Sequence, residues 1–243
     1  AIEAKDLTHR VELTGTVEVA NVAHAFNDMA ASLQKAEQLR RNLVADVAHE
    51  LRTPLSVMQG SLTAQLDGVF PLDLAETAKL YDETRLLSRL VDDLRELAQA
   101  EAGQLQLNLG SIDLRRVISS TAEAFQAMAN EQQAMVIVSA PNQLPLVTAD
   151  SERVAQVLRV LLSNALRHTP VSGTITIAAA PLVKDVEISV RDTGDGLAAD
   201  ELPYVFDRFW RGDKSRARET GGSGLGLAIA KQLIEAQGGS IGV

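Results

Sequence analysis

Cysteine is absent from this chain of 243 residues, and aromatic residues make up only 3% of it. Without cysteine there can be no disulfides, zinc–thiolate sites or thiol nucleophiles, which fits a reducing compartment. The scarcity of aromatic residues means that the core must be built from aliphatic side chains. With 46% hydrophobic and 23% charged residues, the composition is that of a globular protein of one large or two ordinary domains.

Positive charge is also in short supply, because 23 Lys and Arg face 32 Asp and Glu, for a net charge of -9. A nucleic-acid-binding protein needs a basic surface, so the charge argues against that class. No apolar run approaches the roughly 20 residues that span a bilayer. The first residues lack Met and the apolar stretch of a signal peptide. The chain is therefore expected to be an internal piece of a longer protein.

Residues 18–65 contain a single proline and a single glycine, which predicts one long helix. Its apolar residues follow coiled-coil spacing, with a local slip of the heptad near Leu51 and Leu55. A second amphipathic run covers residues 74–97, and Gly103 is a natural helix stop. Two hairpins of this kind can bury their stripes in a four-helix bundle, which predicts a homodimer. Alternatively, the hairpin packs on the second domain. The predicted seam begins with Val22, Phe26, Met29, Leu33 and Ala36.

His49 is the first chemical signal, because it lies two residues from the seam positions Val47 and Leu51 and should face solvent. A solvated, largely neutral imidazole is available as a nucleophile. Glu50 is placed to accept its second proton, and Thr53 lies one turn further on the same face. Pro54 should kink or loosen the helix beside it. Taken alone, an exposed histidine more often has no chemical role.

After residue 104 the pattern changes to short strands alternating with helices, which predicts an α+β two-layer sandwich. We expect strands at residues 105–109, 135–138, 174–180, 185–191 and 240–243. Helices are expected at residues 113–130, 151–168 and 225–237, the first two capped by Asp113 and Asp150. Two glycine-rich loops, residues 192–196 and 221–226, suit close approach of a ligand, and the second suits phosphate binding at a helix start. Asp192 could accept a hydrogen bond from an exocyclic amine; a plain turn with solvated acids is the alternative.

Together these segments resemble the catalytic core of a bacterial two-component sensor histidine kinase. Residues 49–54, His-Glu-Leu-Arg-Thr-Pro, are similar to its phosphoacceptor H box, and residues 161–165 to its N box. Residues 192–196 and 222–226 are similar to the two glycine boxes, with the F box at residues 206–211 between them. The first 40 residues resemble the end of a HAMP module. We expect no role for His9 and His24.

The resemblance implies a role for each matching residue. His49 is the phosphorylated nucleophile, Glu50 its general base, and Thr53 positions water for dephosphorylation of the partner. Asn164 holds the Mg²⁺ that bridges the ATP phosphates, and Asp192 binds the adenine amine. The other nucleotide contacts implied are Arg167, His168, Gly194, Gly196, Gly222, Gly224, Leu225 and Gly226. For Arg167 and His168, an ordinary solvated helix end is an equal alternative. Residues 212–220 would form the ATP lid.

The implied protein is a dimeric histidine autokinase that uses ATP and Mg²⁺, passes its phosphoryl group to an aspartate of a response regulator receiver domain, and has phosphatase activity toward it. Its domains would be a partial HAMP and coiled-coil segment at residues 1–40, a phosphotransfer hairpin at 41–102, and an ATP-binding domain at 103–243. Because the nucleotide site and His49 lie in separate domains, the segment 102–104 must act as a hinge. The parent would be anchored in the inner membrane through an upstream segment absent here, with this part in the cytoplasm.

The sequence departs from the family pattern at three places. Val160 stands where the N box usually has a further asparagine, which puts a phosphate or metal contact in doubt. The HAMP part lacks most of its first helix, and a final hairpin strand is missing beyond Val243, which would expose a sheet edge. Val160 leaves open a catalytically weakened pseudokinase that acts as a dimeric adaptor. Another alternative is a related ATPase without a phosphohistidine, which would leave residues 49–54 unexplained.

Overall fold

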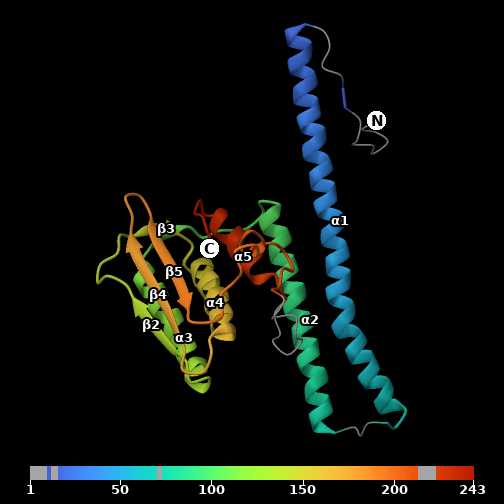
Figure 1. Cartoon of the computed structure of the whole chain (residues 1–243), viewed down its shortest axis with the longest axis vertical. Helices are drawn as coiled ribbons and strands as arrows, with labels where there is room; N and C mark the ends of the chain where they lie inside the picture. The colour runs from blue at the N-terminus through green and yellow to red at the C-terminus, as the bar shows by residue number, and fades with distance from the viewer. Residues whose placement is uncertain (1–9, 12–15, 70–72, 213–222) are drawn as a thin grey trace. The chain divides into compact units, whose positions relative to one another are not determined.

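A computed structural model of the chain describes residues 10–11, 16–69, 73–212 and 223–243. The chain forms two compact units, Ala1–Thr84 and Arg85–Val243. The first contains helix α1, drawn in blue in Figure 1, and the beginning of α2. The second contains the rest of α2 and an α/β domain.

Helix α1 spans Val17–Leu66, which confirms the long helix expected from residues 18–65. It continues unbroken through Pro54, whose side chain is buried. The expected coiled-coil stripe is largely open on this single chain: Val22, Met29 and Leu33 are 71%, 48% and 43% exposed. The small residues Ala23 and Ala30 are buried instead. The apolar stripe of α1 is therefore available for packing.

Helix α2 spans Leu74–Glu101 and so passes from the first unit into the second. Its buried side chains, Leu90 and Leu97, both belong to the second unit. The helix ends where the sequence predicted, since Gly103 adopts a left-handed φ of 64° just beyond it.

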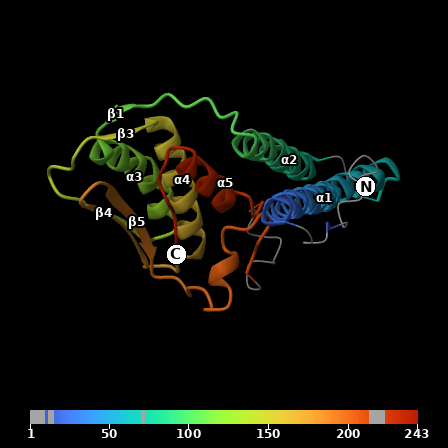
Figure 2. The same cartoon turned by 90° about the horizontal axis from the view of Figure 1, so that it is seen from above.

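The α/β domain places α3 and α4 on one face of a three-stranded sheet (Figure 2). In that sheet β2 runs parallel to β4, and β4 is antiparallel to β5; β1 and β3 form a separate antiparallel pair. The α+β sandwich is thus confirmed. The elements are β1 Gly110–Ile112, α3 Leu114–Glu131, β2 Met135–Ser139, β3 Val147–Ala149, α4 Ser151–His168, β4 Thr174–Pro181, β5 Val186–Asp192, the 3₁₀ helix Leu202–Tyr204 and α5 Gly226–Glu235.

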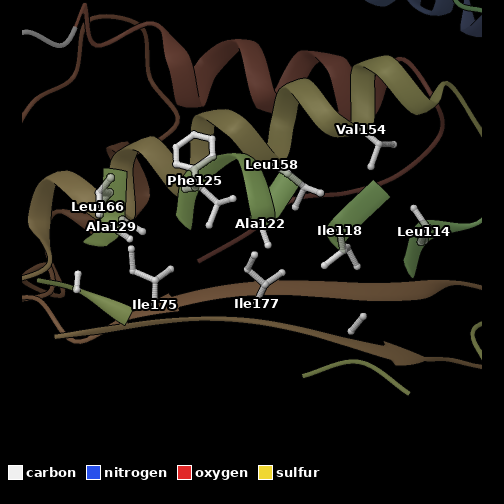
Figure 3. Packing of buried hydrophobic residues seen from close by; sticks show 14 of the residues in the cluster. Leu114, Ile118, Ala122, Phe125, Ala129, Val154, Leu158, Leu166, Ile175 and Ile177 are labelled. Carbon is white, nitrogen blue, oxygen red and sulfur yellow. The ribbon is translucent and has the colours of Figure 1, made fainter. Parts of the chain in front are cut away.

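The core lies between the two helices and the sheet, as Figure 3 shows. Alternate residues of β4, including Ile175 and Ile177, point toward the helices and are buried. From the helices, Ile118 of α3 and Leu162 of α4 are completely inaccessible to solvent. Aliphatic side chains dominate this cluster, as the composition predicted.

Two predicted strands are wrong in the described part of the chain. Residues 105–109 are not a strand despite their alternating leucines, because the Asn108 N–H donates to the Asp150 carboxylate instead of a neighbouring strand. Strand pairing begins only at Gly110, where the three residues of β1 pair with the three residues of β3. Residues 240–243 are not a strand either. Glycines 238, 239 and 242 make an extended conformation costly there.

Candidate functional site

His49 lies on α1 with an exposed side chain, as predicted, while Val47 and Leu51 on either side are partly buried. The Thr53 hydroxyl donates to the backbone carbonyl of His49 at 3.4 Å, so it lies one turn along the same side of the helix. Glu50 is partly buried. An accessible imidazole flanked by a carboxylate and a hydroxyl has the groups that nucleophilic attack and proton removal require.

The residues implied to hold a nucleotide come from α4, the end of β5 and the start of α5. Helix α4 contacts both glycine loops. Near its middle, a Val160 methyl lies 3.1 Å from where a Cβ on Gly226 would be. At its end, the His168 carbonyl would lie 2.4 Å from a Cβ on Gly194. The half-buried Asn164 lies between these contacts, which are separated by about 12 Å of helix.

The first glycine loop is folded back by its own aspartate. Asp192 ends β5, and its Oδ1 accepts a hydrogen bond from the Gly194 N–H at 2.8 Å. A carboxylate can accept several further hydrogen bonds, so this one leaves Asp192 able to accept from an exocyclic amine. Gly196 adopts a φ of 67°, which a side chain would strain.

The second glycine loop packs on the segment 206–211. The Phe209 N–H donates to the Gly224 carbonyl at 2.9 Å, and a Cβ on Gly224 would lie 2.8 Å from the Phe209 backbone. Leu225 is fully buried and anchors the start of α5. Gly222 and nearly all of the expected lid, residues 213–220, lie outside the described residues. The first N–H groups of a helix have no carbonyl partner within it, so the start of α5 suits a phosphate.

Positive charge gathers near the end of α4. Partial desolvation lowers the pKa of Arg167, although the residue stays exposed, and the guanidinium groups of Arg211 and Arg89 lower it further. His168 is exposed in the same turn. Arginines that repel one another are stabilised by a shared anion, so this end of α4 is electrostatically suited to a polyphosphate.

These residues fit a Mg²⁺-nucleotide. The start of α5 and the arginines near the end of α4 suit phosphates, and both glycine loops pack closely on neighbouring backbone. In the described ranges no three His, Cys, Asp or Glu side chains come together as a metal site. The side chain of Asn164 offers one oxygen ligand. Mg²⁺ commonly takes most of its ligands from water and phosphate oxygens, so a single protein oxygen is compatible with it.

The sequence did not reveal which residues touch across these elements. The contacts of Val160 with Gly226 and of Phe209 with Gly224 join segments far apart in the chain, without a local pattern to signal them. Ser223 and Asp93, which are hydrogen-bonded at 3.0 Å, are separated by 130 positions. The expected residues Asp192, Gly194 and His168 do come together, whereas His49 belongs to the other unit. Among the described residues, no helix is long and apolar enough to cross a bilayer.

Three family models match successive parts of the chain. Residues 1–35 match the HAMP domain, residues 39–103 the His Kinase A (phospho-acceptor) domain, and residues 149–243 the histidine kinase-, DNA gyrase B-, and HSP90-like ATPase.

Individual relatives and structures agree with these matches. The signal transduction histidine-protein kinase BaeS of Escherichia coli (strain K12) is 37% identical over 240 residues, 99% of this chain and 51% of BaeS. The chain thus spans about half the length of that relative. The structure of Acinetobacter baumannii histidine kinase AdeS is similar with a TM-score of 0.65 and 30% identity, over 77% of this chain and 86% of that one. The structure of full-length ShkA in complex with AMPPNP is similar with a TM-score of 0.60 and 30% identity, over 83% of this chain and 42% of the ShkA chain.

Proposed function

We propose, from the premise that this chain belongs to the two-component sensor histidine kinases, that it transfers a phosphoryl group from ATP to His49. The observation that carries the proposal is the exposure of His49 on α1, together with a nucleotide-compatible set of residues in the second unit. BaeS and AdeS, named as histidine kinases, support it, as does the nucleotide analogue in the ShkA complex.

Each of the three matched segments corresponds to one proposed role. We assign signal input to residues 1–40, dimerisation and phosphotransfer to 41–102, and ATP binding to 103–243. The family model for the phospho-acceptor domain supports the second assignment. We further propose that this part of the parent protein lies in the cytoplasm and is joined to an inner-membrane anchor; the HAMP match at residues 1–35 supports this.

The nucleotide is held by residues of the second unit. Asp192 accepts from the adenine amine, and Gly194 and Gly196 shape that loop. Gly222, Gly224, Leu225 and Gly226 present the start of α5 to the phosphates, with Arg167 and His168 at the end of α4. Asn164 holds Mg²⁺, which neutralises phosphate charge.

His49 is the nucleophile of the transfer. Its Nε2 lone pair forms a bond to the γ-phosphorus while the bond from that phosphorus to the β,γ-bridging oxygen breaks, and ADP leaves with the electron pair. Glu50 accepts the proton from the other ring nitrogen. The phosphoryl group then passes from His49 to an aspartate of a response regulator. Thr53, one turn beyond, orients water for hydrolysis of that acyl phosphate, which gives the phosphatase activity.

The test is incubation of the chain with Mg²⁺ and γ-labelled ATP. We expect an acid-labile label on the protein that His49→Gln abolishes. The matched control is His24→Gln, because His24 is exposed on the same helix and should leave the label unchanged. Label that persists in His49→Gln contradicts the proposal.

Val160 supports the second candidate, a weakened pseudokinase that works as a dimeric adaptor. Its apolar side chain packs against Gly226 at the phosphate loop, where it provides no polar group. Asparagine is somewhat smaller than valine, so Val160→Asn adds an amide without overfilling the site. We expect the substitution to increase Mg²⁺-nucleotide affinity several-fold, measured by titration calorimetry. No label on the native chain at millimolar ATP, together with label on Val160→Asn, would favour the adaptor.

A further inference from the structure

One face of α2 contacts the α/β domain within the second unit through polar side chains. The buried Leu90 and Leu97 lie on the same side of the helix. Three acidic residues, Asp93, Glu96 and Glu101, share this side of the helix within an arc of about 140°. Each of the three carboxylates contacts a different part of the domain. We call Asp93, Glu96 and Glu101 the docking face.

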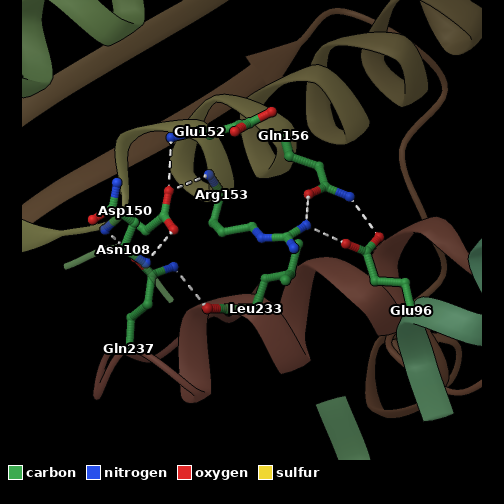
Figure 4. Close-up of polar contacts among 8 residues, drawn as sticks. All are labelled: Glu96, Asn108, Asp150, Glu152, Arg153, Gln156, Leu233 and Gln237. Atoms are coloured by element: carbon green, nitrogen blue, oxygen red, sulfur yellow. Dashed lines mark hydrogen bonds and ion pairs between the residues drawn. The ribbon is translucent and has the colours of Figure 1, made fainter. Parts of the chain in front are cut away.

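Two of the acidic residues form ion pairs that fix the docking face in place. Glu96 pairs with Arg153 of α4, and its Oε2 accepts from the Gln156 amide at 2.5 Å (Figure 4). Glu101 pairs with Arg208, which lies in the segment that packs on the second glycine loop. Side chains at both positions are largely covered. Two partly buried ion pairs therefore join this face of α2 to particular residues of the domain.

Asp93 reaches the phosphate loop itself. The Ser223 hydroxyl donates to its Oδ2 at 3.0 Å, and the same Ser223 oxygen accepts the Leu225 N–H at 3.3 Å. Leu225 is the residue immediately before α5. A carboxylate therefore lies within two hydrogen bonds of the helix start that should receive the nucleotide phosphates.

This is an unfavourable place for a carboxylate. The pKa of Asp93 is raised, chiefly because the carboxyl group is partly buried. The neighbouring carboxylates of Glu96 and Asp92 also raise it, whereas the Ser223 hydrogen bond and Arg89 lower it by less. Phosphates at the same helix start would repel Asp93 again, since like charges a few ångströms apart in a partly desolvated site interact strongly. The Asp93 carboxylate and the nucleotide phosphates would therefore destabilise each other at the start of α5.

We propose that the docking face of α2 and the nucleotide phosphates compete for Ser223 and the start of α5, with Asp93 as the competing anion. The inference rests on the proposed nucleotide site. Nucleotide binding then releases the Asp93 contact, and a docked α2 lowers the affinity for nucleotide. Reciprocity between the two follows from thermodynamic linkage.

The absence of cysteine allows a direct test with the full chain. Asp93→Cys and Ser223→Cys are introduced together and oxidised, and an intrachain disulfide is recognised by altered mobility without a dimer band. We expect saturating AMPPNP to slow the cross-link, the oxidised protein to lose AMPPNP binding in calorimetry, and reduction to restore it. Asp92→Cys with Ser223→Cys is the control, because Asp92 is exposed and one residue off the docking face.

A second arm removes the competing anion without a cross-link. Asp93→Ala should raise the affinity for AMPPNP about tenfold, the lower end of what one hydrogen bond to a charged group contributes. Asp92→Ala should leave it unchanged.

The outcomes separate this inference from the nucleotide site on which it rests. Failure of the cross-link, or equal AMPPNP binding by oxidised and reduced protein, overturns the competition while the nucleotide site stands. An unchanged affinity in Asp93→Ala does the same. If the native chain and every reduced variant fail to bind AMPPNP, the nucleotide site itself is wrong, and the inference falls with it.

Discussion

At the scale of single residues, the glycines of the two loops have packing reasons as well as the conformational ones that the sequence indicated. The sequence predicted loops that let a ligand approach, and the positive φ of Gly196 and Gly224 agrees with that. It could not predict that Gly194 lies against the His168 carbonyl or Gly224 against Phe209, because those contacts depend on tertiary packing. The same holds for Val160, whose departure from the family pattern is visible in sequence but whose partner, Gly226, is not.

Gly194→Ala tests the packing reason at the first glycine loop. Its Cβ would lie 2.4 Å from the His168 carbonyl oxygen and 2.8 Å from the Asp192 Oδ1. Backbone must therefore move, which we expect to cost about 1–3 kcal/mol of unfolding free energy and to weaken nucleotide binding. Gly110→Ala is the control, since nothing lies within 4 Å of its added methyl. Chemical denaturation of both variants provides the measurement, and equal stability would contradict the packing argument.

At the scale of elements, the helices were predictable and the short strands were not. Helix α4 spans Ser151–His168, as the sequence predicted, because Asp150 is a good N-cap and the apolar residues that follow have a helical period. Helix α3 was predictable for the same reasons, with Asp113 as its N-cap. The three-residue strands β1 and β3 carry too few residues for a period, and their pairing is set by neighbours. The alternating leucines of residues 105–109 therefore misled the prediction.

Asp150 does more than cap α4. Its buried carboxylate accepts from the N–H groups of Glu152, Arg153 and Asn108, and its own N–H donates to the Gln237 side chain beyond α5 (Figure 4). We expect Asp150→Ala to cost about 2 kcal/mol or more, since a cap is lost and the Asn108 N–H loses its partner. Asp113→Ala is the matched control: its exposed cap serves two N–H groups of α3 only and should cost less. Thermal unfolding of both variants checks the order, and a larger loss in Asp113→Ala would contradict it.

The same carboxylate gives a pH dependence with a definite sign. Burial raises the pKa of Asp150, but the three backbone donors and Arg153 outweigh it, so the folded value lies below the ordinary 3.8. A lowered folded pKa contributes stability above 3.8 that is lost as pH falls through the folded value. We expect the stability advantage of the native chain over Asp150→Asn to be constant near neutrality and to shrink in acid below 3.8. An advantage that grows in acid, in urea denaturation at each pH, would contradict this.

At the scale of the whole molecule, the sequence indicated a helical part followed by an α/β part, and the fold confirms both. What it could not indicate is that the end of α2 packs with the α/β domain in one unit, because the docking face joins acidic side chains to partners more than 50 positions away. The expected dimer is a proposal. Its physical basis is the stripe on α1 that the single chain leaves exposed.

Leu55→Glu combined with Leu62→Glu tests the proposed dimer, because both residues belong to the apolar stripe within residues 41–102 and are 47% and 48% exposed. Two charges on the stripe would be buried in a helical bundle, so we expect dissociation to monomers, measured by light scattering at micromolar concentration. Met128→Glu is the control, because Met128 is similarly exposed, at 43%, but lies on α3. A native chain that is monomeric at these concentrations, or a double variant that stays dimeric, would contradict the proposed dimer.

The most direct test of the whole account is to locate the phosphoryl group after incubation with Mg²⁺ and ATP, by mass spectrometry of peptides kept at neutral or alkaline pH. We expect one phosphoryl group, on the peptide that contains His49 and on its imidazole. A phosphoryl group on another residue, or a chain that binds and hydrolyses ATP without ever carrying one, would contradict it.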